Sequence, residues 1–152
     1  STALDWFGPA ELVSSSINSI RGRADDDSVL VLKHASGVDS YLSASTVIGA
    51  PGPRIRLIGD KGALIISDLD PQESMLRNGL YPKGGVWGES TKSTAFIHRG
   101  DEITEYQSVD GNYAQFYTQV KEALSGGSWP VTTDEALTVA KIIDLARQNS
   151  IR

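Results

Sequence analysis

Alternating apolar and polar positions dominate the first two thirds of the chain. From Leu12 to Arg21, Val13, Ser15 and Ile17 alternate with more polar neighbours, which is typical of a strand with one buried face. Further stretches of strand character occupy 29–32, 38–48, 54–58, 63–66, 94–98 and 102–109. Short turns at 35–37, 60–61 and 99–101 connect several of them, so we expect an open, mostly antiparallel sheet of about six strands.

The stretch GPRIRLIGDKGALI, residues 52–65, raises the question of a phosphate-binding loop. A P-loop needs the order G-x-x-x-x-G-K-[ST] followed directly by a helix. Here Lys61 precedes Gly62, and the following residues have strand character. The sequence therefore predicts a β-hairpin with Asp60 and Lys61 at its tip.

Helical periodicity replaces alternation in the last third of the chain. The spacing of apolar residues predicts a helix over 113–124 that ends at Gly126, with its apolar face at Tyr113, Phe116, Tyr117, Val120, Ala123 and Leu124. Thr132 and Glu135 form a capping-box pattern before a second helix. The apolar stripe of that helix is expected at Ala136, Val139, Ala140, Ile143 and Ala146.

Two shorter helices are expected earlier in the chain. Residues 3–7 are apolar and end at Gly8-Pro9, which resembles the last turn of a helix that begins further upstream. Asp70 is a plausible N-cap, Pro71 suits the first helical position, and Glu73 follows three residues after the cap. Strands followed by helices, without strict alternation, indicate an α+β domain whose helices cover one face of the sheet.

Composition limits the classes of function. A chain of 152 residues suits one domain, and a net charge of −5 without a Lys/Arg block disfavours nucleic-acid binding. No apolar stretch is long enough for a membrane helix, so no membrane partner is expected. The absence of cysteine excludes disulfides and thiolate zinc sites, and it fits a cytoplasmic location.

Motifs for chemistry are sparse. The chain has no G-x-G-x-x-G fingerprint for a dinucleotide and no G-x-S-x-G elbow for a hydrolase. His34 and His98 lie in expected strands without a metal-ligand spacing, and a structural role is favoured for both, which leaves a hydrolase or metalloenzyme that uses His34 with little support. Asp25–Asp27 lacks the order of a calcium loop, so a solvated turn is the favoured interpretation.

Several segments taken together resemble a known family. GPRIRLIGDKGALI, LDPQESMLRNG, WGE and the stretch from Gly111 to Ala146 are similar, in this order, to the C-terminal domain of the Gfo/Idh/MocA NAD(P)-dependent oxidoreductases. The nearest branch contains scyllo-inositol dehydrogenases and aldose reductase-like enzymes. The resemblance implies a substrate-binding and oligomerisation domain over residues 1–152, with NAD(P) held by an N-terminal Rossmann domain that this sequence lacks.

The family places its catalytic lysine in the Rossmann half, and an Asp/His pair on a helix of which only ALDWFG, residues 3–8, resembles the end. The resemblance therefore implies no catalytic, cofactor-binding or metal-binding residue in this chain, and an inactive fragment. It suggests a sugar or polyol ligand contacted by Arg54, Gln72, Glu73, Trp87 and Tyr113. For Glu73 a role in helix capping and for Tyr113 core packing explain the residues equally well.

Two further expectations concern partners. An uncovered sheet face presents an apolar patch, so we expect a homo-oligomer through that face. The small residues Ser40, Ser43, Ala44 and Ser45 leave room for a ligand or a partner sheet, although an ordinary solvated face explains them as well. The alternative function is an autonomous, non-catalytic binding or dimerisation module that uses this face.

Overall fold

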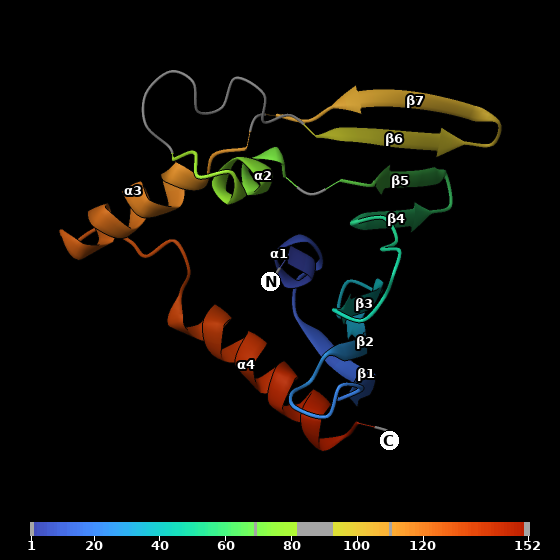
Figure 1. Ribbon diagram of the computed structural model, residues 1–152, viewed down its shortest axis with the longest axis horizontal. Coiled ribbons are helices and arrows are strands. Elements are labelled where there is room, and N and C mark those ends of the chain that lie inside the picture. The colour runs from blue at the N-terminus through green and yellow to red at the C-terminus, as the bar shows by residue number, and fades with distance from the viewer. Residues whose placement is uncertain (1, 69, 82–92, 110, 151–152) are drawn as a thin grey trace. The chain divides into compact units, whose positions relative to one another are not determined.

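The structure, a computed structural model, describes residues 2–68, 70–81, 93–109 and 111–150. The chain forms two compact units (Figure 1). The first comprises Ser1–Gly49 and Val131–Arg152, and the second comprises Ala50–Pro130. Each unit has its own antiparallel sheet.

The first unit contains a three-stranded sheet in the order β1-β2-β3. Its elements are α1 Thr2–Phe7, β1 Ala10–Asn18, β2 Asp27–His34, β3 Asp39–Ser45 and α4 Thr133–Gln148. The register shifts between Leu12 and Ser14, where β1 has a bulge. Because a bulge reverses the alternation of side chains, Val13 is 62% exposed although the sequence pattern placed it on the buried face.

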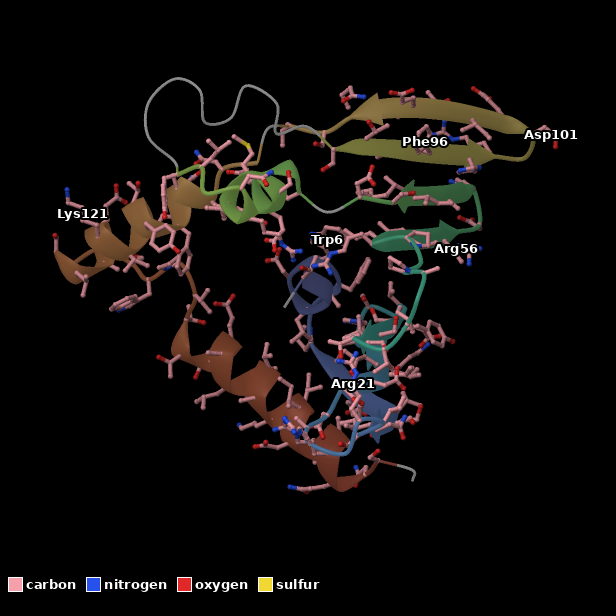
Figure 2. All side chains as sticks on the ribbon, viewed as in Figure 1. Trp6, Arg21, Arg56, Phe96, Asp101 and Lys121 are labelled. Atoms are coloured by element: carbon pink, nitrogen blue, oxygen red, sulfur yellow. The ribbon has the colours of Figure 1, made fainter. Side chains whose placement is uncertain are left out.

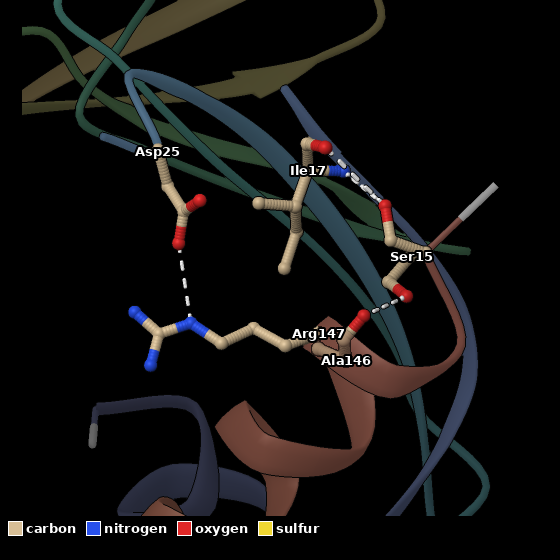
Figure 3. A network of polar contacts seen from close by, with 6 residues as sticks. Ser15, Ile17, Asp25, Ala146 and Arg147 are labelled. Carbon is tan, nitrogen blue, oxygen red and sulfur yellow. Dashed lines mark hydrogen bonds and ion pairs between the residues drawn. The ribbon is translucent and has the colours of Figure 1, made fainter. Parts of the chain in front are cut away.

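Helix α4 packs against β1, although the two elements lie at opposite ends of the sequence (Figure 3). The Ser15 hydroxyl donates to the carbonyl oxygen of Ala146 at 2.8 Å, and both residues are buried. The backbone N–H of Ile17 donates to Ser150 Oγ at 2.7 Å. At the surface, Arg147 Nε donates to Asp25 Oδ2 at 3.1 Å. The first two contacts fix α4 on the sheet because they satisfy polar groups that packing removes from water, whereas the Arg147–Asp25 pair stays exposed.

His34 joins the end of α1 to the β2–β3 hairpin. Its side chain is buried, with Nδ1 at 2.8 Å from the carbonyl oxygen of Gly8 and Nε2 at 2.9 Å from Ser40 Oγ. A carbonyl oxygen only accepts, so Nδ1 carries the proton and donates to Gly8. Phe7 packs edge-on against the imidazole. The structural role expected for His34 is thereby explained by its contacts.

The second unit contains a four-stranded sheet in the order β4-β5-β6-β7. Its elements are β4 Ile55–Gly59, β5 Gly62–Ile66, α2 Pro71–Arg77, β6 Thr94–Arg99, β7 Glu102–Gln107 and α3 Tyr113–Leu124. The hairpin with Asp60 and Lys61 at its tip is confirmed, since Gly59 pairs with Gly62. The positive φ of 146° belongs to Gly62 and not to the two tip residues.

Figure 2 labels Arg56, Phe96 and Asp101 along this second sheet, with Asp101 in the turn between β6 and β7. Gly100 has the positive φ, 60°, that this turn requires. Both expected hairpins of the unit are therefore present at the predicted positions.

The α+β class, the antiparallel pairing and all four expected helices are confirmed. The described strands number seven and divide into sheets of three and four, whereas the sequence pattern predicts a single sheet of about six strands. The apolar stripe of α4 also differs, because Ile143 is exposed whereas Val139, Ile142 and Ala146 are at least half-buried. In the described part of the chain, no helix combines the length and the apolar character needed to cross a membrane.

Candidate functional site

Four of the five predicted substrate-binding residues lie in the second unit at neighbouring element ends. Arg54 directly precedes β4, Gln72 and Glu73 are in the first turn of α2, and Tyr113 is the first residue of α3. Trp87, the fifth, lies outside the described residues. In the site that we describe, the two helix starts therefore supply most of the polar groups.

Helix α2 begins as the sequence predicted. Asp70 is its N-cap, and Asp70 Oδ1 accepts from the backbone N–H of Gln72 at 2.9 Å. Asn78 is the C-cap, and Gly79 follows with a φ of 76°. The Asp70 carboxylate satisfies an N–H group that has no partner within the helix, which fixes the first turn.

Gln72 is completely buried, with 0% of its surface exposed. Its Nε2 donates to Asp70 Oδ1 at 3.1 Å and lies 3.3 Å from Oδ2. Its Oε1 accepts from the backbone N–H of Tyr113 at 3.0 Å. Both ends of the amide are thus engaged within the protein, and this environment differs from that of a side chain offered to a ligand.

Gly111 lies directly against this pair of side chains. A Cβ at position 111 would approach Asp70 Oδ2 to within 2.2 Å and Gln72 Nε2 to within 2.3 Å. Only glycine allows the backbone to pass this close without displacing the two side chains. Sequence reasoning missed both Gly111 and the role of Gln72, because neither residue belongs to a local capping or turn motif.

The phenol of Tyr113 lies within the electrostatic reach of three charged side chains. Burial raises the pKa of Tyr113 above its ordinary value of 10.0, the carboxylates of Asp70 and Glu73 raise it further, and Arg54 lowers it. Tyr113 is still 38% exposed, so solvent and ligands can reach the residue. The charges of Arg54 and Glu73 therefore act on the phenol of Tyr113, while contact of these three residues with a ligand stays a prediction.

Glu73 and Arg54, two charged residues that affect the Tyr113 pKa, differ in their own contacts. Glu73 Oε1 pairs with Arg77 Nη2 at 3.0 Å on the exposed side of α2. Arg54 is exposed and, among the described residues, makes no ion pair or hydrogen bond. Its guanidinium is therefore available to donate hydrogen bonds to the oxygen atoms of a ligand.

The acidic triplet in the first unit has a structural explanation. Asp26 accepts from the backbone N–H groups of Ile20 and Arg21 at 2.7 and 2.9 Å, which closes the loop between β1 and β2. These backbone hydrogen bonds lower the pKa of Asp26 below its ordinary value. Within the described ranges, no group of three or more His, Asp or Glu residues is arranged to hold a metal ion.

A dinucleotide does not fit the described residues. Dinucleotide-binding domains place the phosphates at a glycine-rich turn between a parallel strand and a helix. Every strand pairing in the described part of this chain is antiparallel, and the hairpin at 59–62 leads into a strand instead of a helix. No step of a nicotinamide reaction is therefore assigned to these residues.

Comparison with known proteins relates this geometry to a family. Residues 2–151 match the family described as "Oxidoreductase family, C-terminal alpha/beta domain", of the Gfo/Idh/MocA group. The scyllo-inositol 2-dehydrogenase (NADP(+)) IolW of Bacillus subtilis is 30% identical over 155 aligned positions, covering 97% of this chain and 43% of the relative. An uncharacterised oxidoreductase of Escherichia coli, YdgJ, is 29% identical, covering 72% of this chain and 33% of that protein. The chain thus spans less than half the length of these curated relatives.

Solved structures agree with the fold. A Klebsiella pneumoniae protein described as an oxidoreductase superposes with a TM-score of 0.83 at 28% identity, covering 97% of this chain and 43% of that one. The 3-ketoreductase KijD10 of Actinomadura kijaniata, solved with TDP-benzene and NADP, has a TM-score of 0.70 at 16% identity, covering 98% and 43%, and so supports the fold alone. The chain belongs to the Gfo/Idh/MocA oxidoreductase family, whose C-terminal α/β domain it matches over nearly its whole length.

Proposed function

We propose that this chain is the substrate-binding and oligomerisation domain of an NAD(P)-dependent sugar or polyol oxidoreductase. The observation that carries the proposal is the grouping of Arg54, Glu73 and Tyr113 at the starts of β4, α2 and α3. A cation, a carboxylate and an accessible phenol offer both donors and acceptors to vicinal hydroxyl groups. The aromatic ring adds a flat apolar face for the C–H side of a polyol ring.

The relative from Bacillus subtilis supports an inositol or a similar polyol as the ligand class. That protein is named for its action on scyllo-inositol, and the alignment with it covers 97% of this chain. Trp87 lies in the segment between α2 and β6 and is proposed as a second aromatic contact. The exposed groups Arg54, Glu73 and Tyr113 are proposed to contact the hydroxyls directly, and Gln72 belongs to the site through its buried contacts.

Hydride transfer requires a nicotinamide, which we assign to a separate Rossmann domain of the parent protein. The Bacillus subtilis relative is named for NADP(+), and this supports NAD(P) as the cofactor. The contribution of the present residues would be to bind and orient the polyol, because orientation of the reacting carbon is itself a large part of such catalysis. The isolated chain is therefore proposed to lack oxidoreductase activity, and a cytoplasmic location stays a prediction.

Assembly through a sheet face is proposed for the second unit. One row of its sheet runs from Arg56 on β4 through Ile65 and Phe96 to Glu105 on β7. A two-fold axis parallel to the strands would place β4 of one copy over β7 of the other. Arg56 would then face Glu105 of the second copy, which makes this face complementary to itself.

The adjacent row supports the same arrangement. It contains Ile58 and Ile103 at its two ends, and these side chains are 70% and 61% exposed. The same two-fold axis brings Ile58 over Ile103 of the second copy, so that exposed apolar surface is buried in the pair. A homo-oligomer through this face therefore satisfies both the charges and the apolar side chains of the sheet.

Titration with scyllo-inositol tests the ligand class. In ¹H–¹⁵N and ¹³C-tyrosine NMR spectra, we expect saturable shifts at Arg54, Glu73 and Tyr113 with a dissociation constant in about the millimolar range for a half site. Tyr113→Phe removes the phenol hydroxyl and should weaken binding several-fold, whereas Tyr117→Phe, an exposed neighbour on α3, should have no effect. Absence of saturable shifts at these positions would refute the proposed ligand class.

A further inference from the structure

We propose that Gln72 is a positioning residue that joins the start of α2 to the start of α3 and thereby holds Tyr113 in place within the ligand-binding surface. The inference rests on the proposed function only for what that surface binds. The linkage itself stands on the contacts of three residues, Asp70, Gln72 and Gly111.

Gln72 makes one local hydrogen bond and one that reaches far along the sequence. Its amide nitrogen donates to the N-cap carboxylate of Asp70 at 3.1 Å, and its amide oxygen accepts from the backbone N–H of Tyr113 at 3.0 Å, 41 residues away. Figure 1 shows α2 beside the first turn of α3 within the second unit. A fully buried amide with both ends engaged is costly to break, because each lost partner leaves a buried polar group unsatisfied.

The backbone of Gly111 provides a second and independent indication. It passes so close to Asp70 and Gln72 that a Cβ would lie 2.2 and 2.3 Å from their polar atoms. The backbone that leads into α3 is therefore packed onto the N-cap side chain of α2 and onto the buried amide of Gln72. The Asn112 side chain then caps α3, because its Oδ1 accepts from the backbone N–H of Gln115 at 3.1 Å. The position of the first turn of α3 is therefore held by contacts on both sides of Asn112.

The linkage affects the surroundings of the Tyr113 phenol, because its charged neighbour Glu73 lies on a different helix. Glu73 belongs to α2, whereas the phenol belongs to α3. Their distance is set by the linkage between the two helix starts. The raised pKa of Tyr113, caused by burial and by Asp70 and Glu73, reports that proximity and gives a spectroscopic measure of it.

Two variants of Gln72 test the linkage. Gln72→Met keeps the length of the side chain and removes both hydrogen bonds. Gln72→Glu keeps the shape, and its protonated form retains one donor and one acceptor, like the amide. Its ionised form would place a second carboxylate against that of Asp70. Glutamate should therefore replace Gln72 without loss of the linkage only at acidic pH. Gln119→Met on the exposed surface of α3 is the matched control.

The readouts are the protection factor of the Tyr113 amide against hydrogen exchange and the titration of the Tyr113 phenol by ¹³C NMR, assigned with Tyr113→Phe. For Gln72→Met we expect protection to fall at least about tenfold and the phenol pKa to move down toward its ordinary value of about 10. For Gln72→Glu we expect native protection at about pH 5 and loss of protection at about pH 8. The control should match the unmodified chain in both measurements.

The inference is overturned if folded Gln72→Met leaves the protection and the titration of Tyr113 unchanged. If Gln72→Met does not fold, equal protection of Gln72→Glu at both pH values overturns it. Titration with scyllo-inositol separates this question from the proposed function. Shifts at Tyr113 that are the same in the unmodified chain and in Gln72 variants would keep the function and reject the positioning role. Altered Tyr113 signals without any effect of scyllo-inositol would support the positioning role and reject the ligand class.

Discussion

Gly62 lies against the backbone of the neighbouring strand and is a position where one methyl group should have a large effect. Its φ is 146°, and a Cβ would approach the carbonyl oxygen of His98 to within 2.4 Å. We predict that Gly62→Ala lowers the free energy of unfolding by about 2 kcal/mol or more, because β5 and β6 must move apart or the backbone must rearrange.

Urea denaturation followed by circular dichroism measures the effect of Gly62→Ala. Gly52→Ala is the control, since a Cβ there meets no atom within 4 Å and the φ of Gly52 is not positive. The control should unfold within about 0.5 kcal/mol of the unmodified chain. Equal midpoints for both variants would show that the strands tolerate a side chain at position 62.

Glu135 should contribute stability that depends on pH. The Thr132 hydroxyl donates to Glu135 Oε2 at 2.7 Å and lowers the pKa of Glu135 below its ordinary value of 4.5, with a further contribution from the Thr132 backbone N–H. A depressed native pKa means that the stabilisation is complete above the ordinary value and is lost as the pH falls through the native value. Glu135→Gln should therefore be less stable than the unmodified chain at about pH 7, and the two should converge below about pH 4.

The measurement is the urea midpoint at several pH values for Glu135→Gln and for two variants of the cap. Thr132→Val removes the hydroxyl and should flatten the pH dependence, whereas Thr132→Ser retains the hydroxyl and should preserve it. A difference between Glu135→Gln and the unmodified chain that stays constant down to about pH 3 would contradict the assigned cause.

The predictability of single residues depended on the sequence distance to their partners. Asp70, Thr132 and Glu135 were identified as capping residues, because each cap partner lies within three positions. The role of Gln72 was not predictable, because its partner is a backbone N–H 41 residues away. A glutamine in the first turn of a helix looks like a surface residue until the tertiary contact is known.

At the scale of elements, periodicity located the helices and strands but did not always select the buried side. In α4 the sequence analysis favoured Ile143, whereas the structure buries Ile142 more. Ile142 and Ile143 are adjacent and both apolar, so the sequence pattern does not decide which of them is buried. The docking of α4 on β1 through Ser15 and Ala146 decides it. The bulge after Leu12 likewise follows from strand pairing and has no local turn signal.

The face of the second sheet that carries Arg56 and Glu105 should mediate self-association. We predict that Arg56→Glu or Glu105→Arg alone weakens the assembly on the order of tenfold, because each creates two like-charge contacts across a two-fold axis. The double variant should recover association because the charge pairs are restored in reverse. Sedimentation velocity over a range of protein concentrations measures the dissociation constant.

Lys121→Glu on α3 is the control for a general effect of charge, since Lys121 is exposed and lies outside the sheet. Its association should remain within about twofold of the unmodified chain. If both single charge reversals behave like this control, or if the unmodified chain is monomeric, then this face does not form the interface.

At the scale of the whole molecule, the first unit combines the two ends of the chain and the second is a continuous segment. No local pattern could show that α4 packs with β1, because the residues that meet there lie far apart in the sequence. The Ser15–Ala146 and Ile17–Ser150 hydrogen bonds span 131 and 133 residues. The order of strands and helices did predict the α+β class, and the family resemblance, which depends on the order of several segments and not on one motif, agrees with it.

The strand pairing throughout the described part of the chain bears on cofactor binding. The described strands are joined in antiparallel sheets, and the glycine-rich hairpin leads from strand to strand. Among the described residues, no helix therefore begins at a glycine-rich turn after a parallel strand, where a pyrophosphate would bind. We predict that the 152-residue chain shows no saturable binding of NADPH in a calorimeter at concentrations up to about the millimolar range, nor any oxidation of scyllo-inositol with NADP⁺. Tight, stoichiometric NADPH binding would mean that these residues form a nucleotide site of a kind different from the Rossmann fold. Binding of scyllo-inositol without NADPH would instead separate the two tasks physically, with the polyol held by this domain and the hydride acceptor by another part of the parent protein.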